Sequence, residues 1–349
     1  MHMDNRTSSV ISIDESEFLL LGFFSSWVPA SAQLDFLQCT DTTFCVPAVS
    51  GLPRSKGVEI VRESFAPHDI RISGGDDGSA SEMARIRQNE RWSFKLRGPL
   101  VMKENFNLAM GFRFEFEEFN FENSEALEAP LLRQLEDRPL RSMGVGFYLS
   151  KPFRGNRYVI GRLQSDLNGD WNEGLGTWSD YLRVSAAAVY GIKVDYDQSF
   201  AIGLSYNYAF GQPTIIPVIA YFHSFRDKWG IEALLPARAR LRFTPNPSNN
   251  LYVGCELRGS NYLTELTDES LPLFLESSEI RGVFTYEREI HDWLWMGLNV
   301  GYRHYLGFDL SDSDGLVLKP RNPVLTTEVE DALLYSFSIF MVPPRRFFQ

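Results

Sequence analysis

The stretch Phe200–Phe210, FAIGLSYNYAF, sorts its side chains onto two faces with a period of two. Its even positions are Phe, Ile, Leu or Tyr, and its odd positions are Ala, Gly, Ser or Asn. Successive side chains of a β-strand point to opposite faces, so this stretch is predicted to be a strand with one apolar face. It is also longer than the ~5–6 residues usual for strands of soluble proteins, and it matches the ~9–11 that cross a membrane.

The same alternation recurs from about Arg91 to the end of the chain. It predicts twelve strands, near residues 90–98, 104–120, 140–150, 157–167, 180–193, 199–210, 214–225, 228–244, 249–259, 278–288, 292–308 and 331–341. Residues 228–244 keep one phase through Pro236 and have no Gly or Asn near that proline to make a two-residue hairpin, so we interpret them as one strand kinked at the proline. Short and long connections alternate only up to about residue 200, which leaves fourteen strands as the alternative count.

An antiparallel transmembrane β-barrel is the all-β fold that this pattern favours. In lipid every backbone N–H and C=O must be paired within the protein, and a closed barrel achieves this with strands. The non-apolar face is largely Gly, Ala, Ser and Asn, which suits a narrow lumen. A large soluble all-β domain is the alternative, although its solvent-facing side is expected to be charged.

The composition excludes several classes of protein. Lys and Arg number 34 and Asp and Glu number 45, and the net charge of −11 disfavours a nucleic-acid binder. The 44% of hydrophobic residues excludes global disorder. No P-loop, GxSxG, HExxH or zinc-like Cys/His spacing occurs, so we expect no cofactor and no metal.

The N-terminal part of the chain differs from the rest. Residues 1–32 are predicted to be a signal-peptide region, because a short apolar core ends in Ala30-Ser31-Ala32, a small-residue cleavage pattern. Acidic rather than basic residues precede that core, which departs from the usual signal peptide. Residues 33–89 are predicted to be loosely structured, and residues 90–349 to form the barrel. In an exported protein, Cys39 and Cys45 are candidates for a disulfide.

Charged residues interrupt the small, polar face that is predicted to point inward. They are Arg113, Glu115, Glu117, Glu232, Arg238, Arg240, Arg242, Glu256, Arg258 and Arg303. Like charges in a row are costly unless acids lie opposite. We favour an ion-pair network that fills the lumen and fixes strand register, and the alternative is a charge-lined pore with ion selectivity.

Short motifs in the middle of the chain resemble a protein family. They comprise Gly203, Tyr206, Tyr208, Phe210-Gly211, Pro217, Trp229-Gly230-Ile231-Glu232, Leu235-Pro236, Leu251 and Gly254. In these positions the chain resembles the bacterial outer-membrane β-barrel family called domain of unknown function 6268. The resemblance covers about residues 90–349, and it implies a membrane barrel with no assigned activity.

We therefore expect a barrel in the outer membrane of a Gram-negative bacterium, either structural or a narrow passive channel with a charged lumen. Its expected partners are outer-membrane lipid and, during biogenesis, the barrel-assembly machinery, but no nucleic acid; the sequence does not indicate an oligomeric state. One alternative is an exported soluble all-β binding protein.

A membrane-embedded lipid hydrolase is a further alternative, and it would need Ser and His within hydrogen-bond reach. His223 and Ser224 are adjacent and must point to opposite faces of a strand. His304, near a strand end, is the other candidate base. We do not expect an enzyme.

Overall fold

The computed structural model describes residues 47–74, 81–171, 178–226, 228–264, 273–312 and 323–345. Its strands are β1 (Val58–Phe65), β2 (His68–Gly74), β3 (Glu82–Lys103), β4 (Phe106–Phe121), β5 (Leu140–Pro152), β6 (Arg157–Gly169), β7 (Leu182–Asp195), β8 (Gln198–Asn207), β9 (Thr214–Phe225), β10 (Trp229–Leu235), β11 (Arg238–Asn246), β12 (Asn249–Thr264), β13 (Leu273–His291), β14 (Leu294–Ser311), β15 (Leu325–Val329) and β16 (Ala332–Met341). The helices are the 3-10 turn η1 (Ser124–Ala126), α3 (Pro130–Asp137) and α4 (Trp178–Tyr181).

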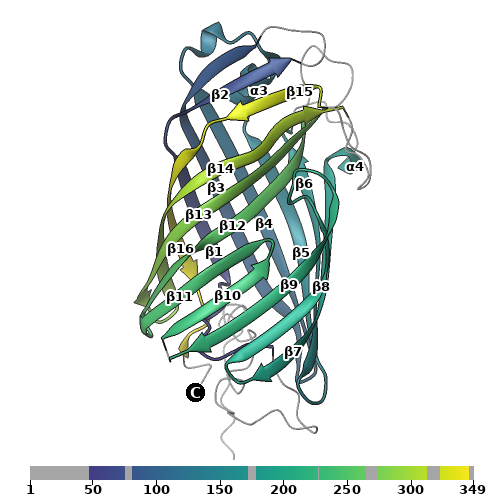
Figure 1. Cartoon of the computed structure of the whole chain (residues 1–349), viewed down its shortest axis with the longest axis vertical. Coiled ribbons are helices and arrows are strands. Elements are labelled where there is room, and N and C mark those ends of the chain that lie inside the picture. The colour runs from purple at the N-terminus through teal and green to yellow at the C-terminus, as the bar shows by residue number, and fades with distance from the viewer. Residues whose placement is uncertain are drawn as a thin grey trace, which may run out of the picture.

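The strands form one closed antiparallel barrel (Figure 1). Closure is made by β1, which pairs with β3 on one side and with β16 on the other. β1 and β2 run in line along β3, and β15 and β16 run in line along β14, so each of these pairs is one interrupted strand. The barrel therefore has fourteen strands, the larger of the two predicted counts.

One of the two additional strands lies in the segment expected to be loosely structured. Residues 33–89 contain β1, β2 and the start of β3, so the barrel begins at Val58 and the boundary at residue 90 was wrong. The apolar alternation of β1 is short because its outward face contains Arg62 after Ile60. Arg62 is exposed and forms an ion pair with Glu90 of the neighbouring β3.

The other additional strand comes from residues 229–243, where the prediction of one kinked strand was wrong. β10 and β11 form a hairpin in which Trp229 pairs with Phe243 and Leu234 with Arg238. Three residues lie between Leu234 and Arg238, and this odd number leaves the alternation of faces in phase across the turn. A phase that continues through a proline therefore does not exclude a hairpin.

With fourteen strands, short turns and longer connections alternate around the barrel with one exception. The lower end in Figure 1 has the short turns and the C-terminal end of the described chain. The upper end has the long connections, between residues 121 and 140, 169 and 182, 264 and 273, and 311 and 325. The short β10–β11 turn is the exception, because it ends well below the upper rim (Figure 1).

The outer wall is an apolar belt. Its outward side chains remain exposed, and they include Ile202, Leu204, Val253, Val300 and Phe337. The alternate positions on the same strands are mostly buried in the lumen. In the part of the chain that the structure describes, no helix is long and apolar enough to cross a membrane.

Near the upper end, adjacent strands shift their inward face by one residue. A bulge in β3 places Ile86 and Asn89 both inward, and a bulge at Leu306 of β14 does the same for Tyr305 and Phe308. β1–β2 and β15–β16 are interrupted beside these bulges. A one-residue shift exchanges the two faces of a strand, so the lumen lining changes from polar to apolar at this level.

Barrel closure predicts a cross-link between the first and last strands. Ile60 and Ile339 are direct partners in the β1–β16 ladder. In a background with the native cysteines replaced by serine, Ile60→Cys with Ile339→Cys should form an intramolecular disulfide, seen as a reduction-sensitive shift on a gel. Ile60→Cys with Ile231→Cys, on β10, should not. Failure of the first pair in folded protein would contradict closure through β1 and β16.

Candidate functional site

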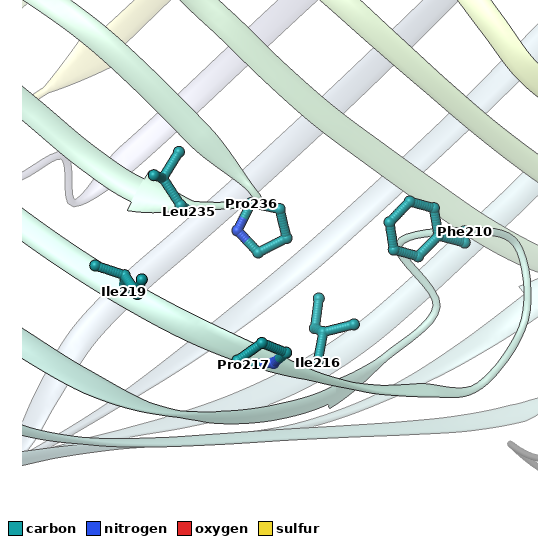
Figure 2. A pocket seen from close by; sticks show the side chains of 6 residues that line it. All are labelled: Phe210, Ile216, Pro217, Ile219, Leu235 and Pro236. Carbon is teal, nitrogen blue, oxygen red and sulfur yellow. The ribbon is translucent and has the colours of Figure 1, made fainter.

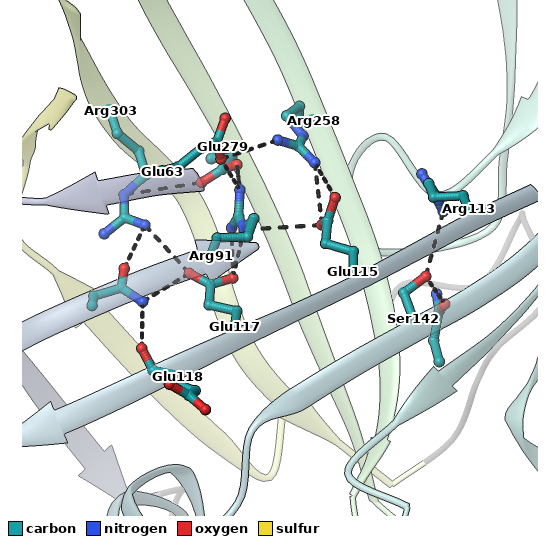
Figure 3. Close-up of polar contacts among 12 residues, drawn as sticks. Glu63, Arg91, Arg113, Glu115, Glu117, Glu118, Ser142, Arg258, Glu279 and Arg303 are labelled. Carbon is teal, nitrogen blue, oxygen red and sulfur yellow. Dashed lines mark hydrogen bonds and ion pairs between the residues drawn. The ribbon is translucent and has the colours of Figure 1, made fainter. Parts of the chain in front are cut away.

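Eight charged side chains from six strands meet in the middle of the lumen, and we call them the central ion-pair cluster. They are Glu63, Arg91, Glu115, Glu117, Arg258, Glu279, Arg281 and Arg303. Figure 3 shows most of these contacts. Four arginines face four glutamates, so the cluster has no net charge when all eight are ionised. A selectivity filter made of charged side chains uses a ring of one sign, which this cluster is not.

Arg91 is the hub of the cluster. One of its guanidinium nitrogens lies 2.6 Å from Glu117, and another lies 3.0 Å from Glu279 and 3.4 Å from Glu63 (Figure 3). These acids come from β4, β13 and β1. Arg303, fully buried, donates to the side-chain oxygen of Asn89 at 2.9 Å. The cluster therefore fixes the relative positions of strands that are not neighbours.

One ion pair spans the lumen. Arg258 of β12 lies 2.9 Å from Glu115 of β4 (Figure 3). These two strands are six places apart around the fourteen-stranded ring. Arg258 also reaches Glu63 of β1, at 3.5 Å. Side chains from opposite walls meet here, so no wide bore passes this level.

A second cluster lies toward the lower end, and it provides acidic partners for the row of three arginines, Arg238, Arg240 and Arg242. Glu232 of β10 accepts from Arg240 at 2.6 Å and from Arg242 at 3.1 Å. Arg240 is the direct ladder partner of Glu232, and Arg238 is that of Glu256. Acids thus lie opposite the arginine row, as a stable arrangement of like charges requires.

The segment before β1, residues 47–57, crosses the lower mouth of the barrel. At one end the backbone N–H of Gly57 donates to Met341 of β16, and at the other the N–H of Ser50 donates to Tyr196 in the β7–β8 turn. The hydroxyl of Ser224 donates to the Ser50 carbonyl at 2.6 Å. We call this segment the lower strap.

The upper mouth is filled by an apolar core, which we call the apolar cap. Helix α3 contributes Leu131, Leu132 and Leu135, each at most 2% exposed. Seven strands surround them with inward side chains, namely Ile70, Ile72, Ala84, Ile86, Phe119, Phe121, Leu140, Tyr262, Leu273, Leu275, Tyr305, Phe308 and Leu310. The amphipathic α3 therefore packs into the barrel mouth rather than lying over it.

A family model described as a domain of unknown function, DUF6268, matches residues 90–314, more than half of the chain. The chain belongs to the DUF6268 family. This agrees with the resemblance seen in its sequence motifs. Among curated proteins, none matches the sequence.

Solved outer-membrane barrels align over most of this DUF6268 protein, at low identity. An outer-membrane channel from Pseudomonas putida F1 is 9% identical with a TM-score of 0.41, covering 84% of this chain and 99% of that one. A mutant of the monoaromatic hydrocarbon channel TodX is 10% identical with a TM-score of 0.36, covering 88% and 99%. The NanC porin is 8% identical with a TM-score of 0.33, covering 81% and 98%.

The ten predicted lumen charges of the DUF6268 chain all lie on the inward face, in distinct groups. Glu115, Glu117, Arg258 and Arg303 belong to the central ion-pair cluster, and Glu232, Arg238, Arg240, Arg242 and Glu256 lie toward the lower end. Arg113 pairs with Asp166 of β6 at 3.1 Å.

Sequence reasoning missed four members of the central cluster. Glu63 was missed because β1 had not been recognised. The other three, Arg91, Glu279 and Arg281, lie in predicted strands. The same period of two that predicted inward positions for the ten charges also places these three inward.

The residues considered for catalysis do not meet. His223 and Ser224 point to opposite faces, and Ser224 is buried against the lower strap. His304 lies on the outer surface, 2.6 Å from Asp331. Cys39 and Cys45 lie outside the described residues. Within the described ranges, no group of three or more His, Cys, Asp or Glu side chains could hold a metal ion.

We expect the loss of a buried ion pair in the central ion-pair cluster to destabilise the barrel much more than the loss of an exposed ion pair. Glu279→Gln leaves buried arginines without compensation, which typically costs about 3–5 kcal/mol. Urea unfolding of the barrel in vesicles should show a clearly lowered midpoint. The matched variant is Glu90→Gln, whose partner Arg62 is 51% exposed and well solvated, so its midpoint should hardly move. Equal midpoints for the two variants would contradict the structural role of the cluster.

Proposed function

We propose that this protein is a structural barrel of the bacterial outer membrane whose axis is closed to solutes. The observation that carries this proposal is the apolar cap, where three leucines of α3, each at most 2% exposed, pack against inward side chains of seven strands. Water and ions cross a pore along polar, hydrated walls. An apolar core of this size gives them no such path. Because outer-membrane barrels keep short turns in the periplasm, the cap would face the cell exterior.

The central ion-pair cluster and the lower strap support the same function. The cluster joins opposite walls in the middle of the lumen, and the strap crosses the lower mouth from β16 to the β7–β8 turn. Opening the axis would require separate rearrangements at three levels. Breaking a buried ion pair is itself costly, because it leaves a charge without its partner.

A narrow passive channel is the second candidate, and a specific observation favours it. Arg113 and Arg258 are 32% and 30% exposed although they point into the lumen. Arg281 and Arg303 each have an Nε without a hydrogen-bond partner among the described residues. Buried polar atoms of this kind usually bind water. A thin file of water beside the cluster would allow small ions to pass if the cap opened.

Single-channel recording distinguishes the two candidates. The wild-type protein in planar bilayers should give no conductance steps, because the cap is closed, while a porin in the same bilayer gives them. Stable steps from the wild type would contradict the structural proposal. If those steps reverse their ion preference in Arg258→Glu, the narrow charged channel is the function instead.

A further inference from the structure

The wall of the barrel is interrupted above the β10–β11 hairpin. The β9–β10 ladder ends at Ile219 and Leu235, and the β11–β12 ladder ends at Arg238 and Glu256. β9 and β12 continue upward beyond these pairs (Figure 1). β10 has seven residues, fewer than the ~9–11 that a strand needs to cross the membrane. The tip of the hairpin therefore lies within the apolar band.

The connection between β8 and β9, residues 208–213, covers this interruption by packing on the outward face of β12 and β13, where Gly259 and Ser278 are ladder partners. Its Ala209 carbonyl accepts from the hydroxyl of Ser278 at 2.9 Å, and its Gly211 carbonyl accepts from the side-chain amide of Asn261 at 3.1 Å. A Cβ at Gly259 would collide with the carbonyl oxygens of this connection, so the glycine permits the close approach. These contacts hold the connection against β12 and β13 above the hairpin.

On the outer side, the interruption leaves an apolar hollow of about 260 Å³ (Figure 2). We call it the wall notch, and its lining residues are Phe210, Ile216, Pro217, Ile219, Leu235 and Pro236. Two of these are prolines, which have no backbone N–H to leave unpaired at an open strand edge. The lining is suited to hydrocarbon, because a free polar group in that position would be costly in lipid.

The surroundings of the wall notch indicate its occupant. It opens on the lipid-facing belt, beside the exposed side chains of Leu204 and Ile215. Its volume lies below the ~300–1,000 Å³ of pockets that enclose small molecules. An open apolar hollow of this size accommodates part of a hydrocarbon chain, and the rest of that hydrocarbon chain lies outside the hollow. The belt around it already contacts lipid chains, so a lipid chain needs no desolvation to enter.

We propose that the wall notch binds one acyl chain of an outer-membrane lipid, which completes the wall where the hairpin is too short. The chain packs against Ile219 and Leu235 and covers the upper edge of β9. Phe210, from the connection 208–213, forms one side of the site. This role is independent of whether the barrel axis conducts.

Native mass spectrometry tests the proposal. The full-length protein is folded into vesicles of palmitoyl-oleoyl phosphatidylethanolamine and phosphatidylglycerol, and is then transferred to mild detergent. The wild type should retain one phospholipid per barrel. Ile219→Trp and, with a smaller added volume, Leu235→Phe fill the notch and should abolish this adduct. Leu298→Trp adds the same bulk to the belt on β14 and should keep it, and heat-modifiable gel migration confirms that each variant is folded.

Two results would overturn the proposal. One is that the wild type and the folded notch variants retain the same amount of lipid, which includes the case in which none of them retains any. The other is a dimer that Ile219→Trp dissociates, because the occupant would then be a second copy of the chain.

Discussion

No water is available to the backbone inside hydrocarbon, so each N–H and C=O of a spanning chain must find a partner within the protein. In this chain the requirement is met by a ladder that returns on itself, with β1 between β3 and β16. The apolar belt, the alternation of faces and the small residues of the lumen all follow from that closure. The short β10–β11 hairpin meets this requirement only in part. It leaves the upper edges of β9 and β12 without a partner in the hairpin, so other groups must cover them.

Closure creates a second problem, which is how to fill the interior. Three solutions occur along the axis: side chains of an apolar core at the upper mouth, balanced charges in the middle, and the lower strap at the other mouth. The change from polar to apolar lining coincides with the β3 and β14 bulges and with the interruptions of the first and last strands. A one-residue shift is the simplest way to exchange the faces of a strand, and four neighbouring strands make it together.

Periodicity predicted the membrane barrel because a lipid-facing surface imposes the period of two on every spanning strand. It failed at two of the fourteen strands. β1 was missed because Arg62 faces outward there and pairs with Glu90. The hairpin at Pro236 was missed because an odd turn preserves phase. Helix α3 falls between two predicted strands, and its eight residues are too few for its apolar side, Leu131, Leu132 and Leu135, to stand out as a helical period.

The inward charges were predictable one by one from strand parity, but their partners were not. Arg258 and Glu115 are far apart in sequence and six strands apart in the ring, so only the closed barrel brings them together. The balance of four arginines against four glutamates likewise becomes visible only when Glu63 of β1 is included. This balance favours a filled lumen over a selective pore.

The accessibility of the lumen to water-soluble reagents tests the closed axis most directly. Ser93 lies on the inward face of β3, beside the central cluster, and Ser81 is exposed at the upper end. With the three native cysteines replaced by serine, Ser81→Cys in intact cells should react rapidly with a membrane-impermeant maleimide. Ser93→Cys should remain unmodified, and its modification at a rate comparable to that of Ser81→Cys would contradict a closed lumen.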